Sequence, residues 1–289
     1  QVFTFIAMAI FASKCDSKCW TKWFDGYYEG SNKLWKSKDS IINDSYCENK
    51  SITSWDSWIL TPSNAWSNYF FLLFGHIEIA ISLFDLMTSH SIKNLSSTNH
   101  IKKHPEWLFY HGLLMMMGGM GSFAFHASFT NMAHLIDIVF GIAMISYPMC
   151  YSIINTCLEE MNRYFWVGDI ASRLSAPCCF IFSIFSGGWI VSNRNSWTRM
   201  TTKACFGLMV GLIVMNVIFK FAKERLFMKR EYTIKGWIFL LAFASAGIAL
   251  FFQEEVINIS ASCKPESGFQ LHALWHFFAS LALFCTMMA

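Results

Sequence analysis

The stretch FQLHALWHFF, residues 269–278, places His272 and His276 four residues apart in a run that is otherwise almost wholly apolar. The run continues as ASLALFCTMMA to residue 289. About 20 apolar residues are enough for a helix to cross a bilayer, so this stretch is typical of a membrane-spanning helix. Residues four apart lie one turn above the other on one helix face. Two imidazoles at membrane depth need a chemical explanation, because ionisable side chains are costly there.

The composition of the whole chain also indicates an integral membrane protein. Of the 289 residues, 54% are hydrophobic, 17% are aromatic and only 14% are charged, whereas roughly 25% of residues are charged in an ordinary soluble domain. The net charge is only +3, and no basic face with interleaved aromatic residues is visible. The sequence therefore does not favour nucleic acid as a partner.

Seven apolar runs are long enough to be membrane spans. They cover residues 66–87, 107–128, 132–155, 169–191, 204–222, 236–252 and 269–288. These runs predict an all-α membrane protein, a seven-helix transmembrane bundle that forms one domain over residues 64–289. Residues 1–63 form an N-terminal segment, and its first 13 residues have the length of a signal-peptide core.

The orientation follows from the basic residues of the loops, which gather on the cytosolic side. Lys and Arg cluster in the loops at 88–106 and 220–235, which places the N-terminus on the lumenal side and the C-terminus in the cytosol. The basic loop at 192–203 disagrees with this orientation. Three N-x-Ser glycosylation sequons agree with it, because they fall on the lumenal side: Asn43, Asn49 and Asn258. A fourth, at Asn94, falls on the cytosolic side, where it should stay unmodified. We expect a multi-pass glycoprotein of the endoplasmic reticulum or Golgi.

Four of the ten cysteines fall on the predicted lumenal side, where disulfides persist. They are Cys15, Cys19, Cys47 and Cys263. Four cysteines allow three pairings, so a Cys47–Cys263 bond, a local Cys15–Cys19 bond and free thiols all remain open. Most of the other six cysteines lie within or at the ends of predicted helices, where a buried cysteine is a small apolar residue.

Five polar residues of the predicted spans reach the same lumenal depth. Ser122 and His126 lie four apart near the end of the second span, and Asp137 lies one turn inside the third. His272 and His276 lie at the start of the seventh span, which runs inward like the third. Helices two, three and seven therefore bring all five side chains together in the predicted topology.

Three neutral imidazoles with one open position are the ligand set of a catalytic zinc site. His126, His272 and His276 are therefore the predicted zinc ligands. Zinc lowers the pKa of bound water to about 7 and polarises a carbonyl group, which suits hydrolysis of an amide or ester. Asp137 is the predicted general base or proton shuttle, and Ser122 is predicted to orient the water or to donate to the developing oxyanion.

Other interpretations of these histidines remain open. Taken singly, His76, His111 and His134 are interpreted as hydrogen-bonded packing residues rather than ligands. A bis-imidazole haem site would use two ligands on facing helices, but it would leave Asp137 and one histidine of the last span unexplained. A third possibility is a non-catalytic seven-helix receptor, or a structural subunit of a larger membrane assembly, in which zinc links helices without a substrate.

The residues also resemble a known family. Gly121, Ser122 and the sequence Phe125-His126-Ala127, followed by Asp137 and the final HALWH at 272–276, are similar to the pattern of the CREST superfamily of seven-helix membrane hydrolases, and most of all to the alkaline ceramidases. The resemblance covers residues 64–289. It implies zinc held by the three histidines, with Ser122 and Asp137 completing the site, and hydrolysis of ceramide to sphingosine and fatty acid. It also implies a lumenal Cys47–Cys263 disulfide.

The N-terminal segment departs from the ceramidase pattern. Ceramidases carry a calcium site in a D-W-C-E-x-N stretch, but here the corresponding SYCENK has Ser45 for the aspartate and Lys50 for the asparagine. Calcium prefers six or more oxygen ligands, so a calcium site is not favoured. The longer segment leaves two alternatives open: a sibling hydrolase that remodels GPI anchors or phospholipids, and a surface for docking a protein partner.

Overall fold

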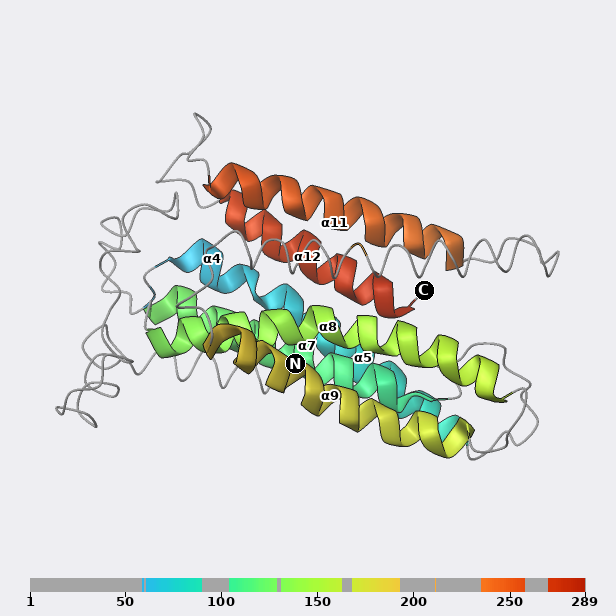
Figure 1. Cartoon of the computed structure of the whole chain (residues 1–289). Coiled ribbons are helices and arrows are strands. Elements are labelled where there is room, and N and C mark those ends of the chain that lie inside the picture. Colours follow the sequence, from blue (N-terminus) through green and yellow to red (C-terminus); the bar gives the residue numbers. More distant parts are fainter. Residues whose placement is uncertain are drawn as a thin grey trace, which may run out of the picture. The chain divides into compact units, whose positions relative to one another are not determined.

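The computed structural model describes residue 59 and residues 61–89, 104–128, 131–162, 168–192, 211, 235–257 and 270–288. This part of the chain is helical and contains no strand (Figure 1). The helices are α4 (Pro62–Ser67), α5 (Tyr69–Ser89), α7 (Glu106–Ser128), α8 (Asn131–Asn162), α9 (Gly168–Ser192), α11 (Lys235–Ile257) and α12 (Leu271–Met288).

Five helical segments are long and apolar enough to cross a membrane. They are Pro62–Thr88, Glu106–Ala127, Met132–Ile154, Arg173–Val191 and Leu271–Met288. They coincide with five of the seven predicted spans. The sixth prediction, 236–252, falls on α11, whose apolar stretch Trp237–Gln253 is shorter than the other five.

Several predictions lie outside the described residues. The span at 204–222 does so apart from Gly211. The same holds for the signal-like start, the calcium-like stretch, the four lumenal cysteines and the three sequons. Among the described cysteines, four are free thiols within helices: Cys150, Cys178, Cys179 and Cys285. Cys179 and Cys285 are buried, as expected for small apolar residues, whereas Cys178 is exposed.

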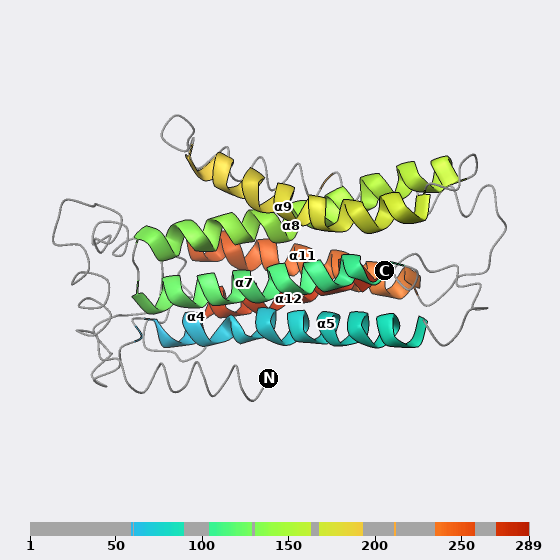
Figure 2. The ribbon, with the colours of Figure 1, turned by 90° about the horizontal axis from the view of Figure 1, so that it is seen from below.

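The first span is made of two helices. Pro62 begins α4 in the first turn, where its missing N–H costs nothing. Asn68 separates α4 from α5, yet its backbone keeps right-handed helical angles. The two ribbons therefore follow one another nearly in line (Figure 2).

The chain forms two compact units, and five of the helices contribute to both. Unit 1 contains the chain up to Leu73 together with Met116–Ile138 and Ala244–Leu281. Unit 2 contains Phe74–Met115, Val139–Phe243 and the end of the chain from Ala282. The boundaries fall inside α5, α7, α8, α11 and α12.

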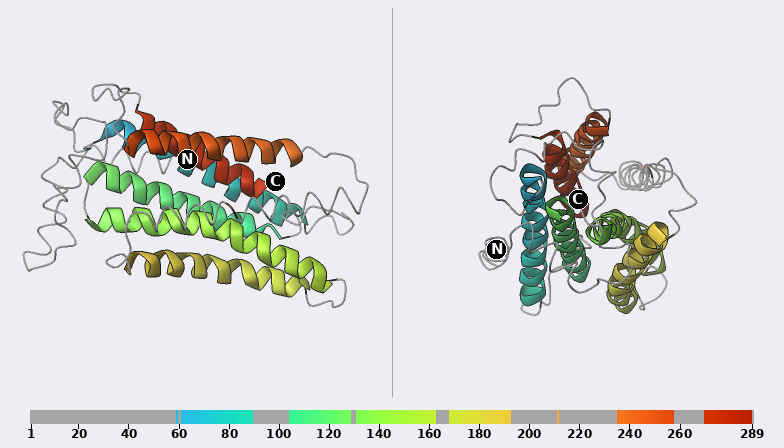
Figure 3. Two further views of the ribbon diagram at one scale, coloured as in Figure 1. Left: turned by 45° about the horizontal axis from the view of Figure 1, so that its top comes forward. Right: turned by 90° about the vertical axis from the view of Figure 1, so that its left-hand side faces the viewer.

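In unit 1, α7 and α8 approach closely at Gly121. A Cβ on Gly121 would lie 2.9 Å from Cγ2 of Ile136 and 3.4 Å from the backbone nitrogen of Asp137. The small residue thus lets Asp137 approach the turn that carries Ser122. In the same unit α11 lies beside α12 (Figure 3), where the rings of Phe252 and Phe278 stack with centroids 5.9 Å apart.

In unit 2, the backbones of α8 and α9 approach each other closely at Gly187. A Cβ on Gly187 would lie 2.5 Å from the carbonyl oxygen of Val139. Each helix carries one internal proline, Pro148 in α8 and Pro177 in α9. Between them the buried Tyr147 donates its hydroxyl to the carbonyl oxygen of Ala176 at 3.4 Å.

Candidate metal centre

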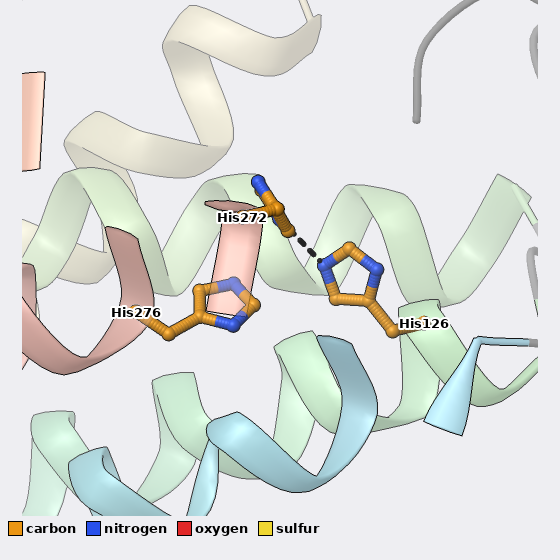
Figure 4. Close-up of side chains that lie close together, drawn as sticks. All are labelled: His126, His272 and His276. Atoms are coloured by element: carbon orange, nitrogen blue, oxygen red, sulfur yellow. Dashed lines mark hydrogen bonds between the residues drawn. The ribbon is translucent and has the colours of Figure 1, made fainter. Parts of the chain in front are cut away.

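Three histidines of unit 1 converge in the structure. His126 lies in the last turn of α7, and His272 and His276 lie in the first two turns of α12. One nitrogen of each ring lies within 4.8 Å of the others. Figure 4 shows the three rings turned toward one another, with Nε2 of His126 3.1 Å from Nε2 of His272.

These distances suit a metal ion. Zinc bound tetrahedrally at 2.0–2.1 Å separates its nitrogen ligands by roughly 3.3 Å, close to the 3.1 Å between His126 and His272. His126 and His276 are 1% and 0% exposed, while His272 is partly exposed. The group can therefore hold a metal ion, and two of its three ligands are buried.

Residues of α4 and of the first turn of α5 contact His276. Its Nδ1 lies 2.7 Å from Oγ of Ser67, and the ring of Phe71 stands edge-on to it with centroids 6.0 Å apart. Its Nε2 is buried and has no hydrogen-bond partner in the part of the chain that the structure describes. A buried nitrogen without a partner is costly, so it is a natural ligand atom.

The segment before α4 also contacts His126. Thr61 donates its backbone N–H at 3.2 Å and its hydroxyl at 2.8 Å to the carbonyl oxygen of His126. That carbonyl lies in the final turn of α7, where carbonyl groups lose their intrahelical partners. Thr61 therefore serves as a tertiary cap for the turn that carries the first ligand.

Ser122 and Asp137 form a pair of their own. Their side chains are hydrogen-bonded to each other across the α7 and α8 contact. Ser122 lies four residues before His126, about 6 Å along the same helix face. Asp137 does not belong to the metal-ligating group. The structure thus brings the three predicted ligands together in one group. It brings the two predicted catalytic residues together in a separate hydrogen-bonded pair.

The sequence interpretation missed one buried pair in unit 2. Nδ1 of His111 on α7 lies 2.7 Å from Oε2 of Glu78 on α5, and both side chains are fully buried. His111 is therefore a hydrogen-bonded packing histidine, as expected. Glu78 could have been predicted to have a partner, because it is a carboxylate in the middle of an apolar run. Carboxylates at membrane depth are usually paired.

Thr61, Asn64 and Ser67 were also missed. Short polar residues at the start of a span are ordinary helix-capping residues, so the sequence gives no separate signal for contacts with ligands on α7 and α12.

Comparison with known proteins adds no relative. No protein-family model matches the chain, and no curated protein matches it significantly. The resemblance to the alkaline ceramidases therefore rests on the quoted residues alone.

Proposed function

We propose that this chain is a zinc-dependent intramembrane amidase that hydrolyses ceramide to sphingosine and a fatty acid. The observation that carries the proposal is the convergence of His126, His272 and His276 from two helices. The resemblance of the surrounding residues to the alkaline ceramidases supplies the substrate class.

The donor set favours zinc in a catalytic rather than a structural role. Three imidazole nitrogens suit zinc, and structural zinc sites usually have four protein ligands, whereas catalytic sites have three. The group contains three residues within the described chain. Zinc bound there would act as a Lewis acid on the amide carbonyl and supply an activated water at neutral pH.

Asp137 and Ser122 supply the proton chemistry in this proposal. Asp137 accepts a proton from the attacking water and returns one to the leaving amine nitrogen as the amide C–N bond breaks. Ser122 donates its hydroxyl to the Asp137 carboxylate and holds it in position. The same hydroxyl lies one turn from His126, on the face that carries the ligand.

The lipid nature of the substrate is supported by the helices themselves. The described chain has five helices able to cross a membrane, and large apolar side chains such as Leu174, Phe182 and Phe185 are exposed along α9. A ceramide has its amide next to two hydrocarbon chains, so it reaches a site at membrane depth without leaving the lipid.

The test is hydrolysis by the purified full chain in detergent micelles, with bound zinc measured by elemental analysis. His276→Ala should lose both zinc and sphingosine release. Asp137→Asn should keep zinc and lose about 10²- to 10⁴-fold in turnover, because the ligands remain while the base is gone. His104→Ala is the matched control, since His104 is also a buried histidine but pairs with Glu106 outside the metal group.

Sphingosine release from ceramide by zinc-free His276→Ala at the wild-type rate would refute the proposal. If the chain binds zinc but does not hydrolyse ceramide, the proposed metal centre stands and ceramide is excluded as the substrate. A phospholipid ester tested in parallel distinguishes a sibling hydrolase.

A further inference from the structure

We infer that Ser67 is a positioning residue that fixes the tautomer of His276, so that Nδ1 carries the proton and Nε2 is left as the ligand atom. The inference rests on the proposed function only for its purpose, because the tautomer belongs to the protein without metal as well.

The direction of two hydrogen bonds carries the inference. Oγ of Ser67 donates to the carbonyl oxygen of Asn64 at 2.8 Å, and a carbonyl oxygen can only accept. A serine hydroxyl has a single hydrogen. Toward His276, 2.7 Å away, the same oxygen is therefore an acceptor. Nδ1 of His276 must be the donor.

A second contact agrees with this assignment. His276 also hydrogen-bonds to the backbone of Asn64. This contact favours the protonated ring, so His276 is the donor and the backbone carbonyl the acceptor. Nε2 of His276 has no hydrogen-bond partner within the described chain, so the donor is Nδ1. Two acceptors on α4 thus select the same tautomer.

The other ring nitrogen is left with a lone pair. A neutral imidazole has one N–H and one acceptor nitrogen, and which one binds metal is set by the bond that the other makes. Nε2 of His276 is buried without a partner in the described chain. The rings of His126 and His272 lie 5.2 Å and 4.5 Å from that of His276, centroid to centroid.

The surroundings of Ser67 show that it belongs to a built contact. Ser67 is 8% exposed and Asn64 is 1% exposed. Thr61, six residues before Ser67, is fully buried and holds the carbonyl of His126. The segment from Thr61 to Ser67 therefore contacts two of the ligands. It bonds to the backbone carbonyl of His126 on α7 and to the ring of His276 on α12.

The first test is spectroscopic and needs no activity. In metal-free full-length protein labelled with ¹⁵N-histidine, long-range ¹H–¹⁵N correlation spectra distinguish a protonated Nδ1 from a protonated Nε2. We expect the His276 signal, assigned by its absence from His276→Ala, to show the proton on Nδ1. A proton on Nε2 in the wild-type protein would overturn the inference.

The second test is zinc affinity, measured by competition with a chromophoric chelator. Ser67→Ala should weaken binding by about 10- to 100-fold, the usual effect of losing the partner of a ligating histidine. Ser67→Thr keeps the hydroxyl and should restore most of the affinity. Ser280→Ala is the control, because it removes a buried hydroxyl one turn further along α12 that bonds to Phe277 instead.

The outcomes separate this inference from the proposed function. Wild-type affinity in Ser67→Ala would overturn it. If the wild-type protein binds no zinc but the spectrum shows a protonated Nδ1, the metal centre fails and the tautomer assignment stands. If the protein binds zinc and hydrolyses ceramide but the metal-free spectrum shows a protonated Nε2, the proposed function stands and the tautomer assignment fails.

Discussion

His111 and His276 are both fully buried, and different partners compensate their burial. His111 bonds to the Glu78 carboxylate at 2.7 Å, and Tyr147 stacks on its ring with centroids 6.1 Å apart. His276 bonds to a neutral hydroxyl and has two other imidazoles beside it. A carboxylate partner can supply a counter-charge, whereas a hydroxyl only orients the ring. The first arrangement therefore suits an ion pair and the second suits a metal ligand.

The Glu78–His111 pair should be strongly coupled. Glu78→Leu or His111→Leu alone leaves a buried polar partner without compensation, which should lower the free energy of unfolding by about 3–5 kcal/mol. The double variant should cost less than the sum of the two, since both polar groups are gone. Thermal unfolding of the four proteins in one detergent measures this. Additive effects would show that the pair contributes no interaction energy.

At the scale of residues, the predictable part of the site is the part with a local pattern. His272 and His276 are four apart, as are Ser122 and His126, and helix geometry alone puts each pair on one face. Asp137 was singled out from its position inside a span and is hydrogen-bonded to Ser122, and its catalytic role stays a prediction. Ser67 and Thr61 could not be found, because their contacts join residues 209 and 65 positions apart.

At the scale of helices, the contact between α8 and α9 depends on Gly187 but not on its neighbour. A Cβ on Gly187 would lie 2.5 Å from a backbone oxygen of Val139, and the backbone cannot move as a side chain can. A Cβ on Gly188 would meet nothing within 4 Å. The two adjacent glycines therefore form a matched pair within one helix.

Gly187→Ala should lower the free energy of unfolding by about 1–3 kcal/mol, because overpacking forces the backbones apart. Gly188→Ala should leave it unchanged or raise it slightly, because alanine favours helix over glycine. Thermal unfolding in the same micelles compares the two. Equal effects would contradict the close approach of α8 and α9.

Helix positions were predictable from apolar length, and helix ends were not. Six predicted spans fall on helices of the described chain, and five of these are long and apolar enough to cross a membrane, since about 20 apolar residues leave little alternative at membrane depth. The break at Asn68 was missed because its backbone stays helical and no Gly or Pro marks it. The end of α8 at Asn162 lies beyond the predicted end at residue 155, because a helix can continue past its apolar stretch.

At the scale of the molecule, all three metal ligands belong to unit 1. Residues of α7 and α12 that carry them, Met116–Ser128 and Leu271–Leu281, lie within that unit. Ligand binding stabilises the structure that contains the site. The effect of metal on local stability should therefore be unequal along the chain.

Removing the metal should lower thermal stability and speed hydrogen exchange mainly in unit 1. Zinc at 100 times its dissociation constant stabilises a single site by about 2.7 kcal/mol. Exchange measured with and without a chelator should change in 116–128 and 271–281 more than in 74–89 and 139–154. His276→Ala should show no response to zinc. Equal changes in both groups of peptides would argue against a centre confined to unit 1.

The membrane class was accessible from composition, because 14% charged residues is well below the roughly 25% of an ordinary soluble domain. Five helices able to span a membrane agree with a multi-pass protein. The number of spans, the orientation and the lumenal disulfide remain predictions, since they depend on residues outside the described part of the chain.

The bond from Tyr147 to Ala176 has a mechanical consequence. Pro148 and Pro177 each remove one backbone donor, so α8 and α9 are weakest at these positions. Tyr147 immediately precedes the first proline and Ala176 the second, so the hydroxyl bond connects the two positions at which the helices lack a backbone donor. We expect bending of either helix at its proline to be coupled to bending of the other through this bond. In Tyr147→Phe, which lacks the hydroxyl, spin labels on α8 and α9 should report uncorrelated bending.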